Sequence, residues 1–473
     1  MACTALHCFT RTRNHNQPSQ LQPSPPPAAL MALPRQRQRV AIVGSGLAGL
    51  ASAYLVAHDA RQQYAVQVFE SGQSLSLDAA SFAVPKPTGH GSDRVDLPMR
   101  AFAGGYYRNL QRLYDHLGVR YRQQPFLFDF VHGHAAYFTH ASNLHRLPPR
   151  PAPVARLRHV AQLLCLAVAY AWFALCCFLV APARGETLQQ YLRRTHTPDL
   201  FVTWYLLPLL SSVSTCPHTA LLAFPASDIV GYKRDTHGAP HYTVSEGVAA
   251  VQARLASGLD VTLNATITAV EPCDKGVRIS WTQGPGPGAD THTERFDRVV
   301  LAVAPDVVGR IFRPLEHHMC RIPTALVESV VHTDYSVLRA SNAPKPGNKN
   351  AQLIRLNTCT QQTPKTESHH VQPCGAIVTT CPYTPLDAAH TLHSARFTRV
   401  LRTPESQRIV NAMFASEPLS CPDDKAVPLW RNGDDNVWLV GGWCWDGMVL
   451  LEGCVVSAMR VAEAFGVTVP WRP

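Results

Sequence analysis

Three glycines open the stretch of this chain whose residue types and spacing point most clearly to chemistry. Gly44, Gly46 and Gly49 belong to the hexapeptide Gly44-Ser45-Gly46-Leu47-Ala48-Gly49. In a G-x-G-x-x-G spacing the first glycine permits a tight turn and the second lets the backbone approach a pyrophosphate. The third allows a helix to pack closely on a strand, and the N–H groups at the start of that helix face the anion. All six residues are therefore candidates for binding a dinucleotide: Gly44, Ser45, Gly46, Leu47, Ala48 and Gly49.

The segments around the hexapeptide have the patterns that such a turn requires. Residues 40–43 (Val-Ala-Ile-Val) form a short apolar run that is typical of a strand buried on both faces. A helical pattern follows the glycines, and residues 65–69 predict a second strand that ends at Glu70. A carboxylate at this place accepts hydrogen bonds from ribose hydroxyls and disfavours a 2′-phosphate. This unit predicts a bound dinucleotide but does not separate FAD from NAD.

A second strand–helix unit stands at the far end of the chain. Residues 437–440 (Val-Trp-Leu-Val) predict a buried strand, which Gly441-Gly442 ends. A helix is predicted from Met448 to Phe465. The N-terminus of this helix could face the N1–C2=O edge of an isoalloxazine, which becomes anionic on reduction. The alternative is a terminal strand and helix that only close the sheet.

These segments resemble the flavin-containing amine oxidase superfamily, which includes phytoene-desaturase-like and protoporphyrinogen-oxidase-like enzymes. Residues 451–454 (Leu-Glu-Gly-Cys) are similar to the helix start that cups the flavin in that superfamily, and residues 297–305 are similar to the strand that returns the chain to the FAD domain. Residues 261–267 resemble the adenine-side strand, which would place the Ile267 backbone beside the adenine. The resemblance implies FAD as the cofactor. It adds these cofactor-binding candidates: Ser71, Arg100, Ile267, Ala302, Gly442, Leu450 and Leu451.

A nearer resemblance is to the predicted FAD/NAD(P)-binding oxidoreductases associated with cyclopropane fatty-acid synthesis. It is discontinuous, covers about residues 40–467 and rests on residues 96–100, 107–110, 128–130, 209–226 and 242–247. Two departures stand out. The amine oxidase superfamily usually has an acid just after the last-strand glycines, where this chain has Trp443. It also has an Arg/Gly-Gly segment after the ribose acid, which residues 74–84, without any glycine, replace here.

These patterns predict an α/β protein. We expect a discontinuous, amine-oxidase-like, Rossmann-type FAD-binding domain and an inserted α+β substrate domain. The FAD-binding domain would comprise residues 39–100, 242–310 and 425–473, and the substrate domain residues 101–241 and 311–424.

Three further segments are expected outside the core. Residues 1–38 contain no acid and carry four arginines, which indicates a disordered basic tail; a mitochondrial presequence is the alternative. Residues 284–288 (Gly-Pro-Gly-Pro-Gly) predict a surface turn between strands. Residues 341–372 have the composition of a mobile surface insertion.

The apolar helix expected at residues 160–181 has no charged residue from Leu163 to Ala181, so its length and composition suit a membrane span. A single crossing would place the two halves of the FAD domain on opposite sides of the membrane. We therefore expect the helix either to enter one leaflet or to be buried in the substrate domain. If it enters a leaflet, charged residues at Leu166, Phe173 and Phe178 should release the protein from membranes.

Composition restricts the remaining function classes. The 473-residue chain has a net charge of +10 but no zinc-finger spacing or basic stripe with aromatics, so we expect no nucleic-acid partner. Its 14 cysteines include no Cys-x-x-Cys pair, which favours reduced thiols in an intracellular protein and no metal site. His132, His134, His317 and His318 are interpreted as ordinary loop histidines.

The expected function is FAD-dependent oxidation or desaturation of an apolar, lipid- or isoprenoid-like small molecule, with hydride transfer to the flavin. Only one dinucleotide fingerprint is visible, which favours oxygen, a quinone or another carrier as the electron acceptor. No catalytic residue can be named; Trp443 and Trp445 either line the substrate face or pack in the core. The alternatives are a flavin amine oxidase, an NAD-dependent dehydrogenase, or a non-catalytic FAD- or NAD-binding accessory protein at a membrane.

Overall fold

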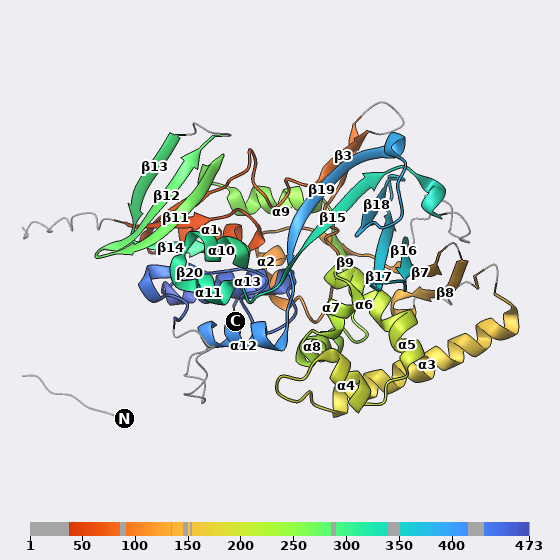
Figure 1. The fold of residues 1–473 in the computed structure, drawn as a ribbon. Coiled ribbons are helices and arrows are strands. Elements are labelled where there is room, and N and C mark those ends of the chain that lie inside the picture. Colours follow the sequence, from red (N-terminus) through yellow and green to blue (C-terminus); the bar gives the residue numbers. More distant parts are fainter. Residues whose placement is uncertain are drawn as a thin grey trace, which may run out of the picture. The chain divides into compact units, whose positions relative to one another are not determined.

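A five-stranded parallel sheet carries the glycine-rich turn (Figure 1). Its strand order is β10-β2-β1-β14-β20. The computed structural model describes residues 37–85, 91–133, 135–144, 150–151, 154–284, 290–338, 351–414 and 430–472, and Arg37–Pro473 forms one unit. Most of the predicted tail and residues 285–288 of the predicted turn lie outside the described residues. The five strands are β1 (Gln38–Val43), β2 (Tyr64–Phe69), β10 (Asp260–Thr262), β14 (Arg298–Leu301) and β20 (Val437–Leu439).

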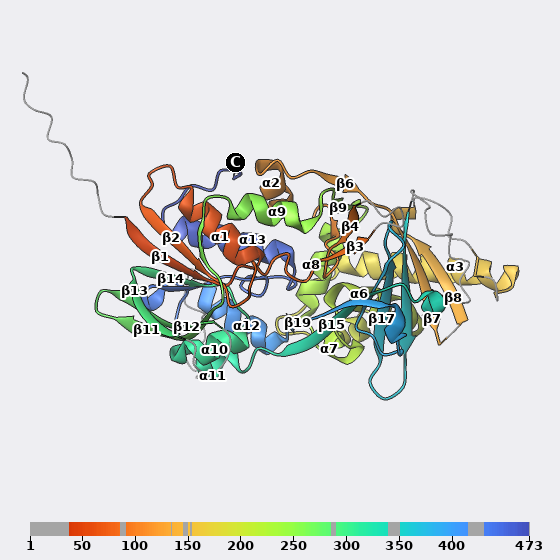
Figure 2. The ribbon, with the colours of Figure 1, turned by 90° about the horizontal axis from the view of Figure 1, so that it is seen from above.

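Both faces of this sheet are covered, which explains why its strands are apolar runs rather than alternating ones. Val40 and Ile42 pack against helices α1 (Leu47–Ala57) and α13 (Leu451–Ala464). Ala41 lies in the core on the opposite face. That face is covered by the antiparallel strands β11 (Ala265–Cys273), β12 (Gly276–Gln283) and β13 (Asp290–Phe296) and by helix α10 (Pro305–Ile311) (Figure 2).

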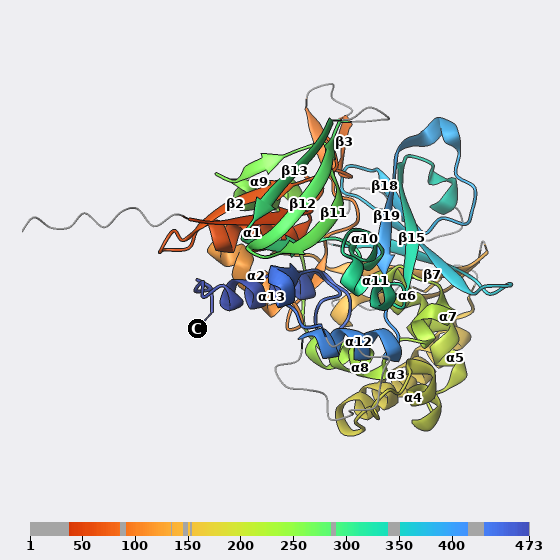
Figure 3. The ribbon, with the colours of Figure 1, turned by 60° about the vertical axis from the view of Figure 1, so that its left-hand side comes forward.

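A second, seven-stranded sheet has the order β19-β15-β18-β17-β16-β7-β8. Neighbouring strands are antiparallel except β16 and β7, which are parallel. Helices α3 to α8 gather beside this sheet (Figure 1 and Figure 3). The strands are β7 (Phe126–His132), β8 (Ala135–Ala141), β15 (Thr324–His332), β16 (Gln352–Cys359), β17 (Lys365–Val371), β18 (Ile377–Thr380) and β19 (Thr391–Val400).

Strands β16 and β17 correct the prediction of a mobile insertion at residues 341–372. Residues 341–350 lie outside the described residues, but 352–371 form a hairpin in the middle of the second sheet. Most polar residues of its two strands are buried, whereas the turn at residues 360–363 is exposed. The Glu367 carboxylate accepts hydrogen bonds from Asn357 Nδ2 (2.8 Å) and Thr384 Oγ1 (2.5 Å), which satisfies polar atoms that composition alone assigns to the surface.

Smaller elements complete the chain. Strands β3 (Phe82–Pro85) and β4 (Ser92–Val95) form a hairpin, and β9 (His241–Val244) pairs with β5 (Phe102–Ala103) and β6 (Tyr121–Gln123). The other α-helices are α2 (Arg108–His116), α3 (Arg156–Leu179), α4 (Leu188–Arg194), α5 (Asp199–Phe201), α6 (Leu207–Ser214), α7 (His218–Leu222), α8 (Ala226–Asp235), α9 (Gly247–Ala256), α11 (Glu316–Met319) and α12 (Pro404–Phe414).

The predicted fold class is confirmed: this is an α/β protein with a parallel, Rossmann-like sheet and further sheets and helices. All five parallel strands come from the three sequence segments predicted for the cofactor domain, while the seven-stranded sheet comes from the other two. The exact domain boundaries stay a prediction.

Candidate functional site

The three glycines of the first turn have three different surroundings. Gly44 has a φ of +99°, and a Cβ there would lie 2.7 Å from Ala302 O. A Cβ on Gly49 would lie 2.0 Å from Gly44 O, so only glycine lets α1 pack this close to the turn. Gly46 differs, because its φ of −67° suits any residue and a Cβ would meet no protein atom within 4 Å. The protein itself therefore requires two of the glycines, while the third leaves open space at the start of α1, where a pyrophosphate would bind.

Glu70 stands at the end of β2, as predicted, and it holds the turn. Its Oε2 accepts hydrogen bonds from Ser45 N (3.1 Å) and Ser45 Oγ (2.5 Å). Its Oε1 accepts from Gly72 N (2.9 Å) and Ser71 Oγ (3.2 Å). Each carboxylate oxygen can accept more than one hydrogen bond. The binding of a ribose by Glu70 and Ser71 stays a prediction.

Arg100 brings a positive charge close to the turn. One of its nitrogens, Nη2, donates to Leu77 O (3.0 Å), whereas the buried Nε has no hydrogen-bond partner among the described residues. Burial lowers the pKa of Arg100, and the nearby Tyr114 and Asp96 oppose that shift. A buried cationic donor without a partner is costly unless a ligand satisfies it. Arg100 therefore fits an anionic group beside Gly46.

The segment that follows β20 folds back tightly onto the start of α13. This helix begins at Leu451, three residues later than predicted, because the backbone at Leu450 is extended (φ −134°, ψ 177°). A Cβ on Gly453 would lie 2.6 Å from Gly442 O, and one on Gly442 would lie 3.0 Å from Leu450 O. These glycines are needed for the close approach of the loop and the helix.

The two tryptophans of this loop have separate positions. Trp443 is buried, donates from Nε1 to Val303 O (3.3 Å) and lines the cavity described below. Trp445 donates to Met448 O (3.0 Å) and covers Gly453. Trp445 is thus a packing residue, and Trp443 stands at the boundary of core and cavity.

Arg402 positions this loop, although no sequence pattern pointed to this residue. Its fully buried guanidinium donates from Nη1 to Trp445 O (2.8 Å) and from Nη2 to Trp443 O (2.9 Å). It also lies 3.6 Å from the Asp228 carboxylate on α8. Burial raises the pKa of Asp228 to about 6, although the charge of Arg402 opposes this. Arg402 therefore connects the loop between β20 and α13 to helix α8 beside the second sheet.

Glu452, the acid of the helix start, serves the fold. Its carboxylate accepts from Asn109 N (2.9 Å), Asn109 Nδ2 (2.8 Å) and Leu110 N (3.0 Å) at the start of α2. It thereby satisfies N–H groups that a helix start leaves without partners. Burial raises its pKa. This acid joins α13 to α2 and does not line the cavity.

A cavity of about 1130 Å³ lies between the glycine turn and the helices beside the second sheet. At one end it is lined by eight of the predicted cofactor residues. At the other end it is lined by aromatic and aliphatic residues of β7, α3 and α6, among them Phe128, Phe173 and Leu210. The eight are Gly46, Leu47, Ala48, Arg100, Ala302, Gly442, Leu450 and Leu451.

The other predicted residues lie behind this surface. Gly44, Ser45 and Gly49 form the turn itself, and Glu70 and Ser71 lie on its far side. Ile267 lies in β11, where its side chain belongs to the core on the opposite face of the parallel sheet. Its proximity to an adenine concerns the backbone and stays a prediction.

The apolar helix predicted at residues 160–181 is α3, and only one of its faces is buried. Phe173 is 1% exposed and Cys177 is fully buried, whereas Leu164 is 64% and Val168 72% exposed. Within the described part of the chain it is the one helix long and apolar enough to cross a membrane by length and composition, and 28% of its most apolar window is buried. One face of α3 therefore packs on protein and the other faces outward. The entry of this helix into a leaflet stays a prediction.

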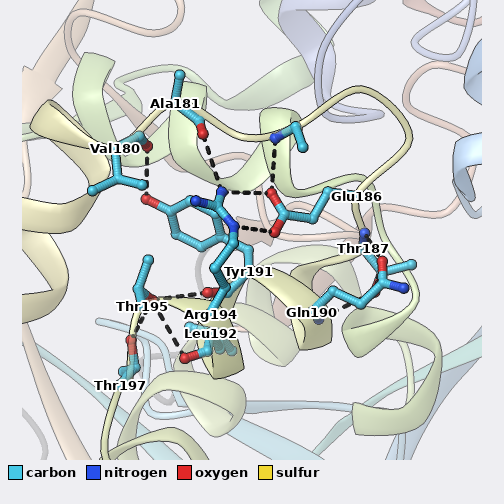
Figure 4. Close-up of polar contacts among 11 residues, drawn as sticks. Val180, Ala181, Glu186, Thr187, Gln190, Tyr191, Leu192, Arg194, Thr195 and Thr197 are labelled. Atoms are coloured by element: carbon cyan, nitrogen blue, oxygen red, sulfur yellow. Dashed lines mark hydrogen bonds and ion pairs between the residues drawn. The ribbon is translucent and has the colours of Figure 1, made fainter.

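A polar network fixes the chain just beyond α3 (Figure 4). Arg194 on α4 forms a bidentate pair with Glu186 (2.7 and 2.8 Å) and donates to Ala181 O (3.1 Å). Tyr191 donates to Val180 O (3.1 Å). The hydrogen bonding between Arg194 and Glu186 is the main reason why the pKa of Glu186 is lowered and the pKa of Arg194 is raised. The chain thus turns back directly after α3 and holds the end of that helix against α4.

Comparison with known proteins agrees with this fold. Residues 42–117 match the family model described as NAD(P)-binding Rossmann-like domain. The chain is similar in structure to a CLA-producing fatty acid isomerase from P. acnes, with a TM-score of 0.56 and 12% sequence identity over 90% of this chain and 98% of that chain. No curated protein matches the sequence. At this identity the similarity shows a shared fold, and the family match shows a Rossmann-like dinucleotide-binding region.

Proposed function

We propose that this protein is an FAD-dependent oxidoreductase that acts on an apolar, lipid- or isoprenoid-like substrate. One observation carries the proposal: a single cavity joins the dinucleotide turn to an apolar wall. Ligand sites are typically mostly apolar, with a few polar groups that fix orientation. The fold shared with a fatty acid isomerase supports the substrate class.

The residues present fit FAD. The open space at Gly46 and the unpartnered Nε of Arg100 suit its pyrophosphate, and the loop at Gly442 with Leu450 and Leu451 suits its ring system. FAD, when bound, supplies a hydride acceptor. Phe128, Phe138 and Tyr205 on the apolar wall would exclude water and hold a hydrocarbon chain in place.

The released chromophore tests the cofactor. We expect the purified protein, once denatured, to release free FAD, identified by its absorption and fluorescence. A colourless protein, or one that releases only NAD, would contradict the proposal. Bound FAD that no substrate or reductant turns over would favour the accessory-protein alternative, and hydrogen peroxide formed with a panel of amines would favour amine oxidation.

The mass of the product tests the reaction. We expect a polyunsaturated fatty acid or an isoprenoid hydrocarbon, incubated with the holoprotein and an electron acceptor, to lose two hydrogens. A product of unchanged mass with a moved double bond would show isomerisation in place of net oxidation. Mass spectrometry with double-bond localisation distinguishes the two results.

The outward face of α3 supports a second part of the proposal, binding to one leaflet of a membrane that contains anionic lipids. Exposed apolar residues follow one helix face, from Leu157 through Leu164 and Val168 to Leu179. Exposed arginines stand near both ends of the helix, Arg156 at its start and Arg184 beyond its end. An apolar face with basic flanks fits a helix that lies in the headgroup region. Leu163 and Leu166 of the same helix line the cavity, so a lipid could enter from the leaflet.

The structure changes the mutations that test this binding. Phe173 is buried and Leu166 lines the cavity, so charges at either position would disturb the fold or the site. We expect the double change Leu157→Asp and Val168→Asp, at residues that are 84% and 72% exposed and do not line the cavity, to abolish co-sedimentation with phosphatidylcholine–phosphatidylglycerol vesicles. Leu326→Asp, at a 69% exposed leucine on β15, is the matched control. Equal sedimentation of all three proteins would contradict leaflet binding.

A further inference from the structure

The charged residues that line the cavity are all basic. Among the described residues its lining includes Arg100, Lys233 and Arg399 but no Asp or Glu. Arg100 stands beside the glycine turn, where the pyrophosphate of a dinucleotide accounts for it. Lys233 on α8 donates from Nζ to His237 Nδ1 (2.6 Å) and lies over the ring of Tyr170 on α3 (4.9 Å). Arg399 lies on β19, in the second sheet, and a dinucleotide at the glycine turn gives no reason for it.

Arg399 uses only one edge of its guanidinium. Its Nε donates to Ser214 O (3.0 Å) and its Nη2 donates to Val213 O (3.4 Å), both at the C-terminal end of α6. A guanidinium has five N–H donors arranged in a planar fork. Nη1 and the second hydrogen of Nη2 have no hydrogen-bond partner among the described residues, so the Nη1–Nη2 edge of the guanidinium is free. That edge can bind a carboxylate through two parallel hydrogen bonds.

No described Asp or Glu lines the cavity beside Arg399. The titratable groups that act most strongly on it are the phenol of Tyr107 and three thiols, Cys216, Cys381 and Cys454. Burial raises the pKa of all four, to about 11 for Cys381 and Cys454, so they are neutral at pH 7. Burial also lowers the pKa of Arg399 itself.

Two buried arginines show the contrast with Arg399, whose side chain is half-buried. Arg355 lies 3.1 Å from the carboxylate of Asp129, and Arg402 lies 3.6 Å from that of Asp228. A buried charge is normally paired, because its desolvation is otherwise uncompensated. Arg399 alone of these three has no acid beside it.

From this arrangement we infer that Arg399 binds the carboxylate of an otherwise apolar substrate, with the hydrocarbon part of that substrate in the remainder of the cavity. This inference rests on the proposed function and names the substrate class more closely: a long-chain carboxylic acid rather than a neutral hydrocarbon. A planar, two-oxygen anion matches the free edge of the guanidinium. Arg399 is then a specificity-determining residue on the substrate side.

Binding of matched probes tests the inference. Oleate, methyl oleate and oleyl alcohol share one chain and differ at the end group, and their affinities for the holoprotein can be measured by calorimetry at pH 8. We expect the wild type to bind oleate about 10- to 100-fold more tightly than the alcohol or the ester, the range for a charge-assisted pair. Equal affinity for the three probes in the wild type would overturn the inference without any variant.

Variants locate the anion. We expect Arg399→Gln to abolish the preference for oleate and leave the affinity for oleyl alcohol unchanged. Arg399→Lys, which keeps the charge, is expected to keep part of the preference for oleate. Loss of the preference in Lys233→Gln, with the preference kept in Arg399→Gln, would overturn the inference and place the anion at Lys233 on α8. Oleyl phosphate bound more tightly than oleate in an Arg399-dependent way would overturn the carboxylate assignment.

Flavin content separates this inference from the proposed function. Arg399→Gln is expected to release as much FAD on denaturation as the wild type. Loss of flavin in this variant would place Arg399 in the cofactor site and overturn the inference. If the wild type releases no flavin, the proposed function fails, and the end-group preference and its dependence on Arg399 still show whether the acid site exists.

Discussion

At the scale of single residues, the empty space at Gly46 and the crowding at Gly49 make opposite demands on a new side chain. We expect Gly46→Val to keep the stability of the wild type, because its Cβ meets no protein atom, but to lose most bound flavin. Gly49→Ala places a Cβ 2.0 Å from Gly44 O and should destabilise the fold by about 1–3 kcal/mol. Thermal unfolding and released flavin measure both effects. Gly231→Val, where a Cβ also finds open space, is the control. Full flavin content in Gly46→Val would refute the role of this gap.

Two buried histidines make the free energy of unfolding depend on pH in the acid range. Burial lowers the pKa of His218 and of His370 to about 4, from an ordinary value of 6.5. Between these values the unfolded chain takes up a proton that the folded one does not. Stability is therefore complete above pH 6.5 and falls as the pH decreases, by about 3 kcal/mol for each histidine at pH 4. Urea unfolding between pH 7.5 and 5 should show a smaller loss in His218→Gln than in the wild type. Identical losses would show that His218 is not held neutral.

At the scale of elements, the loop between β20 and α13 depends on Arg402 in addition to its own backbone turns. Removing one partner of a buried, hydrogen-bonded ion pair leaves the other charge unpaired. We expect Arg402→Gln to lower the free energy of unfolding by about 3–5 kcal/mol and to release the loop that carries Trp443 and Trp445. Tryptophan fluorescence and urea unfolding measure this. Arg396→Gln, which breaks an exposed pair with Glu328, should cost under about 1 kcal/mol. Similar costs for the two variants would contradict the positioning role.

At the scale of the whole unit, the cavity lining comes from both large sheets, so a ligand there stabilises both together. We expect FAD at a hundredfold excess over its Kd to stabilise residues 37–473 by about 2.7 kcal/mol. Calorimetry of the protein with and without FAD should show one transition that moves as a whole. Two transitions, of which only one shifts, would mean that the sheets unfold independently.

The sequence by itself determined the parts of this protein that depend on local sterics and short periods. The turn needs glycine at position 44, where φ is +99°, and at position 49, where a Cβ would meet Gly44 O. The apolar runs at residues 40–43 and 437–440 are typical of strands with both faces covered. The order of these segments along the chain was enough to predict the parallel sheet and the dinucleotide turn.

Only the tertiary structure decided which side chains meet across long sequence distances. The polar composition around Asn357 and Glu367 predicted surface residues. The two residues instead lie opposite each other in the pairing of β16 with β17 and hydrogen-bond there, which composition does not reveal. Phe173 and Val168 are both apolar and lie five residues apart on α3. Packing alone buries Phe173 and leaves Val168 exposed. Arg399 and Arg402 carry the same charge three residues apart, yet only Arg402 has an acid beside it. That difference depends on which elements pack around each guanidinium, and so the fold, not the local sequence, sets what each arginine can bind.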